Sequence, residues 1–327
     1  MKRRQVLVAA AGLACWPLAA AAQAPRRVGV LQFRGGLMNR DQPGGIAFVT
    51  AMRERGYREG KDYLFDDRQW ERQEDVPGLV RELVRLKTDV IIAAAPPSIV
   101  GAVAVTQTVP IVMMYSAEPV AMGLVQSLRR PGGNVTGLTW DHGFETSLKS
   151  LELLKEAIPG LRRVGLIWDG TDSVHPTYAK YFEKAAPRVS MTLISAELRR
   201  AGDFDAVFAR LRREQAQALV ILPSGQITIP HRQGLMALAM RDAIPTLVNI
   251  VSAREWPGAV LHYGPHVGDM PRRAAAYVDR ILKGANPAEL PIEQPDKYDL
   301  VVDLRAARRL KLTIPRTVLV RADRVIE

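Results

Sequence analysis

The sequence predicts an α/β protein with two doubly wound parallel-sheet lobes joined by a multi-crossover hinge. The main observation is a repeat of short apolar segments, each rich in β-branched residues and followed by a loop with Gly, Pro or Asp. The matched pairs are residues 26–31 with 162–167, 89–93 with 218–222, and 109–114 with 244–249. Pairs that recur in the same order indicate two lobes of similar construction.

The apolar segments have no regular polar alternation, which is typical of parallel strands that are covered on both faces. Between them lie stretches with helical spacing, such as Val76, Val80, Leu83 and Leu148, Leu151. Strands that alternate with helices predict a parallel sheet with helices on both sides. Each lobe is therefore expected to be doubly wound.

The length of 327 residues also favours two domains over one. Turn residues at 131–134 and a helical pattern from Ser147 place a lobe boundary close to residue 138. Further crossings are expected near Gly264 and in the Pro-rich stretch 287–295. The expected division is 1–24 as a signal peptide, 25–138 plus about 266–290 as the first lobe, and 139–265 plus about 291–327 as the second.

The first 24 residues have the order of a secretory signal peptide. Lys2, Arg3 and Arg4 precede an apolar stretch at 6–14, and small residues lead to a cleavage site near Ala22 or Ala24. Export through the twin-arginine route is an alternative, because Arg3 and Arg4 are adjacent. The apolar stretch is shorter than the roughly 20 residues of a spanning helix, and no later stretch reaches that length. We therefore expect a periplasmic protein without a transmembrane segment in its mature chain.

Cys15 is the only cysteine and lies within the expected signal. Lipid attachment at Cys15 is an alternative to its removal, although Gly12 stands where a lipoprotein signal normally has Leu. If Cys15 is removed, disulfides, thiolate metal sites and cysteine nucleophiles are excluded.

The formal charge of +11 becomes +8 without Lys2, Arg3 and Arg4. The positive residues are spread along the chain and only 6% of residues are aromatic. Nucleic-acid binding requires basic residues gathered on one face together with aromatic platforms. The charge therefore indicates a solvated basic surface and no nucleic-acid partner.

The candidate binding residues follow from the strand pattern. In open parallel sheets, ligands bind beyond the carboxyl ends of the strands. That rule selects loops that begin near residues 33, 95, 115, 136, 168, 223 and 249, all of which are expected to line one cleft between the lobes. The candidate ligand-binding residues are Phe33, Ser98, Tyr115, Ser116, Glu118, Thr136, Gly137, Trp168, Asp169, Ser224 and Asn249.

Several of these residues suggest specific roles. Ser98 and Ser224 are expected to open helices at equivalent places in the two lobes, where backbone N–H groups could hold a carboxylate; plain helix capping is the alternative. Glu118 could bind an ammonium group or be a solvated loop residue. Tyr115 and Trp168 could stack on a ligand ring or belong to the core. Together they suit an amino-acid-like zwitterion.

Enzymatic function is not indicated. The histidines form no H-E-x-x-H pattern, and Pro265 interrupts the His262 to His266 spacing, so no metal site is expected. There is no nucleophile elbow, P-loop or dinucleotide fingerprint, so we expect no cofactor. The adjacent carboxylates Asp66 and Asp67 are expected to be solvated at a strand end.

Several longer segments carry a family likeness. They are 131–137 (PGGNVTG), 151–155 (LELLK), 277–285 (YVDRILKGA) and 290–295 (LPIEQP), within a likeness that extends from 16–19 to 321–327. On these segments the chain resembles the ABC-transporter substrate-binding proteins, whose better-known relatives are tryptophan-binding-like periplasmic proteins. Glu118 stands where that family usually has Asp before Pro, and Lys311 replaces a common Gly.

The resemblance implies a type I periplasmic-binding fold that captures a small molecule by hinge closure and presents it to the permease and ATPase subunits of an importer. A sensing or scavenging protein without a transporter is the alternative within the same fold. The identity of the ligand is not implied by any of the matched segments.

Overall fold

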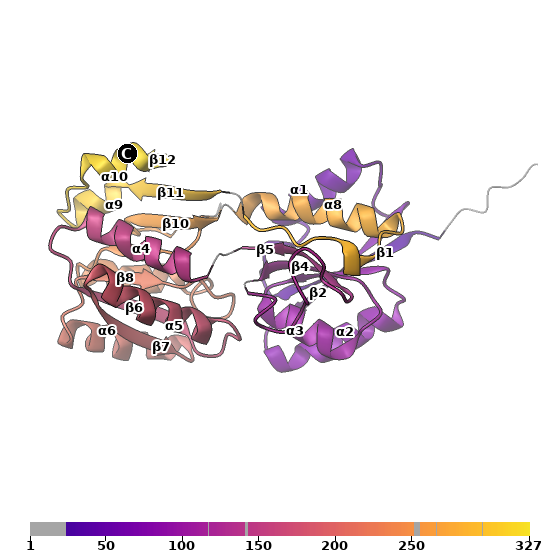
Figure 1. The fold of residues 1–327 in the computed structure, drawn as a ribbon, viewed down its shortest axis with the longest axis horizontal. Helices are drawn as coiled ribbons and strands as arrows, with labels where there is room; N and C mark the ends of the chain where they lie inside the picture. The colour runs from indigo at the N-terminus through magenta and orange to yellow at the C-terminus, as the bar shows by residue number, and fades with distance from the viewer. Residues whose placement is uncertain (1–23, 117, 141–142, 252–255, 266, 296) are drawn as a thin grey trace, which may run out of the picture.

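A computed structural model describes residues 24–116, 118–140, 143–251, 256–265, 267–295 and 297–327. The expected signal peptide lies almost wholly outside these residues. The chain forms two lobes, each built on one β-sheet, side by side along the long axis of the molecule (Figure 1). Among the described residues, no helix combines the length and the apolarity that crossing a bilayer requires.

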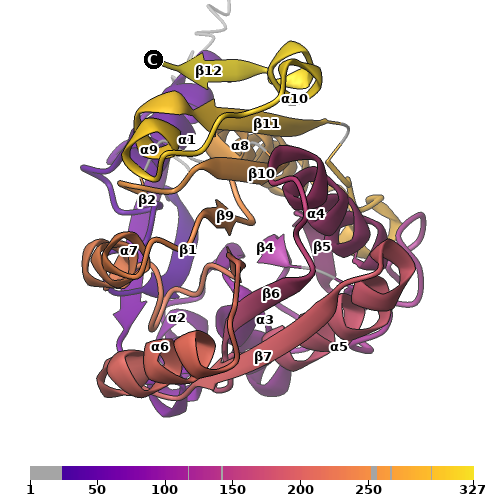
Figure 2. The ribbon, with the colours of Figure 1, turned by 90° about the vertical axis from the view of Figure 1, so that its left-hand side faces the viewer.

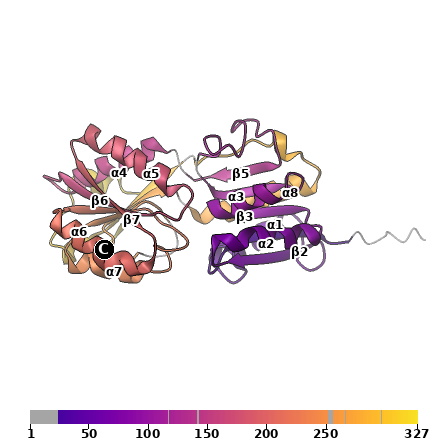
Figure 3. The same ribbon diagram turned by 90° about the horizontal axis from the view of Figure 1, so that it is seen from below.

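Lobe 1 contains a five-stranded sheet in the order β2-β1-β3-β4-β5, and every neighbouring pair is parallel. Helices α1 and α8 pack against each other above this sheet and α2 and α3 lie below it (Figures 1 and 3). The strands are β1 (Arg26–Phe33), β2 (Tyr63–Trp70), β3 (Val90–Ala94), β4 (Ile111–Ser116) and β5 (Val135–Thr139). The helices are α1 (Pro43–Glu54), α2 (Val76–Arg85), α3 (Pro96–Val105) and α8 (Met270–Leu282), with 3-10 turns η1 (Gln73–Asp75), η4 (Val267–Asp269) and η5 (Pro287–Glu289).

Lobe 2 contains a seven-stranded sheet in the order β12-β11-β10-β9-β8-β6-β7 (Figure 2). Its strands are β6 (Arg163–Asp169), β7 (Thr192–Leu198), β8 (Ala218–Ile221), β9 (Thr246–Val248), β10 (Leu261–Pro265), β11 (Tyr298–Asp303) and β12 (Arg324–Ile326). Its helices are α4 (Phe144–Ala157), α5 (His175–Ala185), α6 (Phe204–Arg213), α7 (Arg232–Arg241), α9 (Leu304–Arg309) and α10 (Arg316–Arg321), with η2 (Ala186–Val189) and η3 (Ala201–Asp203). Only the β10–β11 pair is antiparallel among the described pairs.

The repeated sequence segments form equivalent strands in the two lobes. The matched pairs become β1 and β6, β3 and β8, and β4 and β9. The central residues of all six strands are buried, as expected for central parallel strands covered by helices on both faces. The fold class predicted from these repeats is confirmed.

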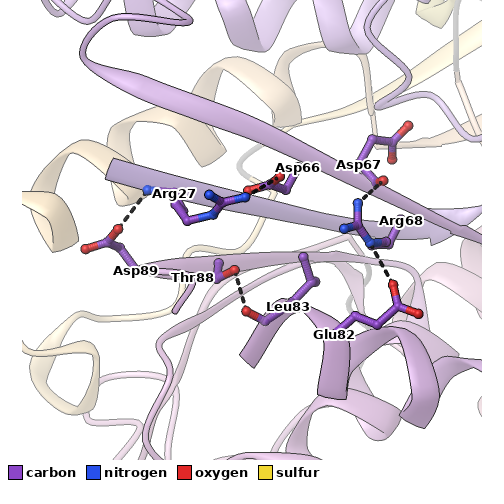
Figure 4. A network of polar contacts seen from close by, with 8 residues as sticks. All are labelled: Arg27, Asp66, Asp67, Arg68, Glu82, Leu83, Thr88 and Asp89. Carbon is purple, nitrogen blue, oxygen red and sulfur yellow. Dashed lines mark hydrogen bonds and ion pairs between the residues drawn. The ribbon is translucent and has the colours of Figure 1, made fainter. Parts of the chain in front are cut away.

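Strand β2 at the edge of lobe 1 carries charged residues that are paired across the sheet (Figure 4). Arg27 of β1 donates to Asp66 at 3.0 Å, and Gln32 donates to Asp67 at 2.9 Å. The expectation that Asp66 and Asp67 are solvated at a strand end was wrong, because both lie in the middle of β2. A sequence pattern cannot show that the neighbouring strand supplies their hydrogen-bond donors.

The chain passes between the lobes in three places. It leaves lobe 1 after Trp140, returns between Pro265 and Val267 so that α8 packs on the first sheet, and leaves again between Pro295 and Lys297 to form β11. The exact residue boundaries of the two domains stay a prediction.

The returning segment 290–293 runs alongside β5 and joins the first passage, which follows β5, to the third passage, which follows Pro295. Thr136 Oγ1 donates to the Leu290 carbonyl at 2.7 Å, and the Glu293 N–H donates to the Gly137 carbonyl at 3.0 Å. Gly137 has φ of +124°, and a Cβ built on it would lie 2.4 Å from the Met113 carbonyl oxygen. Only glycine fits there, because both the backbone conformation and the spacing to β4 exclude a side chain.

We expect Gly137→Ala to lower the free energy of unfolding by about 3 kcal/mol or more, because the methyl group would strain the backbone and displace β4. Gly133→Ala is the matched control, since a Cβ on Gly133 meets nothing within 4 Å. That control should stay within about 0.5 kcal/mol of the parent protein in denaturant unfolding. Equal stability of the two variants would contradict this role of Gly137.

Candidate functional site

A cavity of about 80 Å³ lies between the lobes, and we call it the interlobe cavity. A single water needs about 10–15 Å³ of such a volume, so the interlobe cavity has room for several waters or a small organic group. The residues that line it lie at or after the ends of β1, β3, β4 and β5 of lobe 1 and of β6, β8, β9 and β10 of lobe 2. They are Gln32, Phe33, Leu37, Ala94, Ala95, Pro96, Tyr115, Trp140, Asp172, Val174, His175, Pro223, Gly225, Ile229, Ile250, Trp256 and Val267.

The lining is mainly apolar and includes aromatic rings from several loops. Phe33 and Tyr115 extend from the ends of β1 and β4, Trp140 follows β5, and the buried Trp256 belongs to lobe 2. Trp140 Nε1 donates to the Tyr178 hydroxyl at 3.2 Å, which links the end of β5 to α5. Such a cavity suits a ligand that has an aromatic or apolar portion.

Phe33 is held in place from both lobes. Its ring packs edge-on against Trp70, with 6.2 Å between the ring centroids, and Trp70 Nε1 donates to the Ser98 hydroxyl at 2.8 Å. On the other side, a Cβ built on Gly225 would lie 2.6 Å from the Phe33 ring. The absence of a side chain at Gly225 therefore lets lobe 2 approach the Phe33 ring directly.

The end of β4 and the loops that follow β3 and β4 contain residues in backbone conformations that L-amino acids rarely adopt. Ala95 has φ of +105°, Tyr115 +57° and Glu118 +48°. Strained non-glycine residues cluster at ligand-binding and active sites, where the surrounding structure holds them. Two of the three, Ala95 and Tyr115, line the interlobe cavity.

The polar groups of the cavity come mainly from the β6–α5 connection. Asp172 Oδ1 accepts hydrogen bonds from the N–H groups of Val174, at 2.9 Å, and His175, at 3.4 Å. The buried His175 accepts the Asp169 N–H at Nδ1, at 3.0 Å. An accepting Nδ1 leaves the ring hydrogen on Nε2, so His175 presents a neutral imidazole with one N–H donor.

The structure separates the candidate residues into groups. Phe33 and Tyr115 line the interlobe cavity. Asn249 lines a smaller cavity that shares Trp140 and His175 with it, and Glu118 lines a third beside the first turn of α5. Whether any of these residues contacts a ligand stays a prediction.

The expected helix starts at Ser98 and Ser224 were wrong. Helix α3 begins at Pro96, so Ser98 is its third residue, and its buried hydroxyl also donates to the Ala94 carbonyl at 3.4 Å. Ser224 opens a turn, and α7 begins only at Arg232. The Ser224 hydroxyl accepts the N–H groups of Ile227 and Thr228 at 3.1 and 3.2 Å. Both hydroxyls therefore serve the fold.

The other candidates lie behind the cavity or away from it. Thr136 and Gly137 join β5 to the returning segment 290–293. Ser116 is buried in β4, where its carbonyl accepts the Trp140 N–H at 2.9 Å. Trp168 Nε1 donates to the Ser195 hydroxyl within lobe 2, at 2.9 Å. Asp169 is fully buried, and its backbone N–H positions His175.

Sequence analysis missed several residues of the lining, notably Trp140, Asp172, His175 and Trp256. A signal was present for two of them. Asp172 stands two residues before the first of the N–H groups at the start of a helix, and Trp140 directly follows the loop that was expected to begin near residue 136. Nothing local indicates His175, because its role depends on the Asp169 backbone.

Polar contacts also join the lobes beside the cavity. Gln73 of lobe 1 donates from Nε2 to the Thr171 carbonyl at 2.7 Å and to Gln226 Oε1 at 3.1 Å, both in lobe 2. We call Gln73, Thr171 and Gln226 the interlobe clasp. Its contacts and the close approach of Gly225 to Phe33 define a closed arrangement of the lobes.

The described residues contain no group of three or more His, Cys, Asp or Glu side chains that could hold a metal ion.

His262, one of the histidines considered in the sequence, lies in β10. Burial lowers the pKa of His262 to about 4, so the ring is neutral at physiological pH.

Two α/β lobes that enclose an apolar cavity at their strand ends define a class of two-lobed small-molecule-binding proteins. The chain belongs to the family of ABC transporter substrate binding proteins, whose model matches residues 28–326. The resemblance noted in the sequence is thereby confirmed.

Three known proteins are similar to this chain in sequence or in fold. A curated "Tyrosine-binding protein" of Clostridioides difficile is 22% identical over 285 residues, which cover 84% of this chain and 79% of that protein. An ABC domain from Streptococcus pneumoniae in complex with L-Trp superposes with a TM-score of 0.83 at 22% identity, covering 93% of this chain and all of that one. A ligand-free, open substrate-binding protein with adhesive properties from Clostridium difficile gives a TM-score of 0.67 at 19% identity, over 92% and 99% of the two chains.

We expect Ala95→Gly to raise the free energy of unfolding by about 1 kcal/mol, because glycine tolerates the backbone conformation that strains alanine. Ala104→Gly, on the exposed side of α3, should instead lower it by up to about 1 kcal/mol. Thermal and denaturant unfolding of both variants measure the difference. A destabilised Ala95→Gly variant would show that the loop after β3 is not strained.

Proposed function

We propose that this protein is the periplasmic solute-binding component of an ABC importer. It captures a small molecule in the interlobe cavity and delivers it to the permease and ATPase subunits of the transporter. The main support for the proposal is one apolar cavity whose walls come from strand-end loops of both lobes. A ligand that touches both lobes stabilises the closed arrangement, which a transporter can distinguish from an open one.

The proposed ligand is amino-acid-like and has an aromatic ring. Phe33, Tyr115, Trp140 and Trp256 provide aromatic surface within the lining. The relatives named above are a tyrosine-binding protein and a protein in complex with L-Trp, which supports the same ligand class. A small apolar cavity with few polar groups favours one compact ring over a sugar or an extended chain.

We propose a binding role without catalysis. His175 Nδ1 accepts a backbone N–H and Asp172 Oδ1 accepts two. These bonds hold both side chains in positions that serve recognition. A general base would instead need its free nitrogen or oxygen within reach of a nucleophile.

A sensing or scavenging role without transport is the second candidate. The relative described as a substrate-binding protein with adhesive properties favours it, because adhesion is a property in addition to substrate binding. Uptake assays in cells that lack the gene distinguish the candidates. Importer function requires loss of uptake of the bound compound, and a sensing or scavenging role requires that uptake persist.

A thermal-shift screen with aromatic amino acids and related amines tests the proposed binding site. At a hundred times its dissociation constant, a ligand adds about 2.7 kcal/mol of stability. We expect Gly225→Leu to abolish this response, because its side chain would push the Phe33 ring into the interlobe cavity.

Gly234→Leu is the matched control, since a Cβ on Gly234 of α7 meets nothing within 4 Å. The control should keep the full ligand response. A Gly225→Leu variant that is stabilised as much as the parent protein would place the ligand elsewhere.

Hinge closure has a separate test in the interlobe clasp. We expect Gln73→Ala to increase the radius of gyration of the ligand-free protein in X-ray scattering, because closed molecules lose both hydrogen bonds from Gln73. Gln107→Ala, an exposed glutamine of lobe 1 outside the clasp, should leave the scattering unchanged. Identical scattering of the two variants would show that Gln73 does not stabilise closure.

A further inference from the structure

A second, smaller cavity adjoins the interlobe cavity on the side of lobe 2, and we call it the side cavity. Its volume is about 10 Å³, close to the space that a single water needs. It shares Trp140, His175 and Pro223 with the interlobe cavity, so the two are neighbours. Its other lining residues are Thr146, Tyr178, Leu222, Asn249 and Pro265. The side cavity therefore extends the proposed binding site by the space of about one non-hydrogen atom.

His175 presents a fixed hydrogen-bond donor where the two cavities meet. The residue is only 2% exposed, and its Nδ1 accepts the Asp169 N–H. Because a backbone N–H can only donate, Nδ1 carries no hydrogen and the ring hydrogen is on Nε2. The imidazole also packs edge-on against the Tyr178 ring, with 6.4 Å between the centroids. No described residue accepts a hydrogen bond from Nε2, so this buried donor has its partner still to find in the cavity.

Asn249 presents an acceptor to the same side cavity. Its Nδ2 donates to the Ser150 hydroxyl and to the Tyr263 carbonyl, both at 3.0 Å. A carbonyl can only accept, so this partner identifies the amide nitrogen and leaves Oδ1 as the acceptor. Within the described part of the chain, nothing donates to Oδ1. The buried Thr146, whose hydroxyl can both donate and accept, lines the side cavity as well.

The combination of a donor and an acceptor determines which group fits the side cavity. A hydroxyl satisfies both, because its oxygen accepts from His175 Nε2 and its hydrogen donates to Asn249 Oδ1. A carboxylate here would face the Asn249 oxygen, and an ammonium group would face the His175 N–H. Either would leave a buried polar group unsatisfied. The side cavity therefore suits a neutral hydroxyl, and the charged groups of an amino-acid-like ligand bind elsewhere in the interlobe cavity.

The aromatic ring proposed for the ligand can carry such a hydroxyl. Trp140 lines both cavities, so a ring that packs against Trp140 lies next to the side cavity. A hydroxyl on the ring edge is rigidly attached, so its placement costs little conformational entropy. The side cavity accepts one such oxygen and has no space for a longer substituent.

We propose that the side cavity receives a hydroxyl on the ring of the ligand, and that His175 and Asn249 thereby select a phenolic ring over a plain phenyl ring. This inference rests on the proposed function, since it specifies the ligand class of the same binding site. The preferred ligand is a hydroxylated aromatic amino acid such as tyrosine. Phenylalanine leaves the two polar groups to a water or unpaired, so it binds without the hydrogen bonds that the hydroxyl supplies.

Three amino acids test the proposal by isothermal titration calorimetry on the full chain. L-Tyrosine has the ring hydroxyl and L-phenylalanine lacks it. In 4-fluoro-L-phenylalanine, an atom of similar size that donates no hydrogen bond takes the place of the hydroxyl. We expect L-tyrosine to bind about tenfold or more tightly than either of the other two.

His175→Asn separates the donor from the fold. We expect the Asn side-chain oxygen to replace Nδ1 as the acceptor of the Asp169 N–H, while no donor remains at the place of Nε2. Affinity for L-tyrosine should fall to about that of L-phenylalanine, whose own affinity should change little. His231→Asn, at an exposed histidine just before α7, is the matched control and should keep the ratio of the two affinities.

Equal affinities of the parent protein for L-tyrosine and L-phenylalanine would overturn the proposal, and this comparison decides even if His175→Asn does not fold. A folded His175→Asn variant that weakens both amino acids by the same factor would overturn it too, because a purely structural role leaves the ratio unchanged. Failure of all three compounds to bind also overturns it. The proposed solute-binding function is then judged separately, by whether other aromatic compounds in the thermal-shift screen stabilise the parent protein and fail with Gly225→Leu.

Discussion

The carboxyl ends of the parallel strands in the two sheets face each other across the interlobe cavity, and the site depends on this constraint. The loops that leave the carboxyl ends of parallel strands all lie at one edge of the sheet. Each lobe therefore contributes one wall of loops to the cavity, and the loops themselves need not be similar in sequence. Every described segment that lines the cavity follows a strand of one sheet or the other. Three passages of the chain between the lobes keep these two edges opposed.

Small residues and prolines in these loops determine which side chains and backbone N–H groups reach the cavity. Gly225 lets the Phe33 ring meet lobe 2, whereas Pro96 and Pro97 remove N–H groups from a helix start that could otherwise bind an anion. Asp172 supplies an anion to α5 from within the chain. The cavity is consequently apolar and aromatic, and its lining also includes the Asp172 carboxylate and the neutral His175 imidazole.

The strands and their outgoing loops could be predicted from the sequence because their apolar segments repeat and leave few alternatives. Phe33 and Tyr115 were found for that reason. Ser98 and Ser224 were assigned the wrong local structure, because α3 already begins at Pro96 and α7 begins only at Arg232. The partner of the Ser98 hydroxyl, Trp70, lies on strand β2 and is not visible in a local pattern. His175 and Trp256 were missed because tertiary contacts, and no motif, bring them to the cavity.

The central claim is that a ligand in the interlobe cavity holds the lobes closed. Electron–electron distance measurements between spin labels on Lys61→Cys in lobe 1 and Lys184→Cys in lobe 2 test it most directly, in a chain with Cys15→Ser; both positions are exposed. With the aromatic compound that stabilises the protein most, the account predicts one narrow distance distribution, and a broader distribution that extends to other distances without it. The same distribution at zero and at saturating ligand would contradict the account.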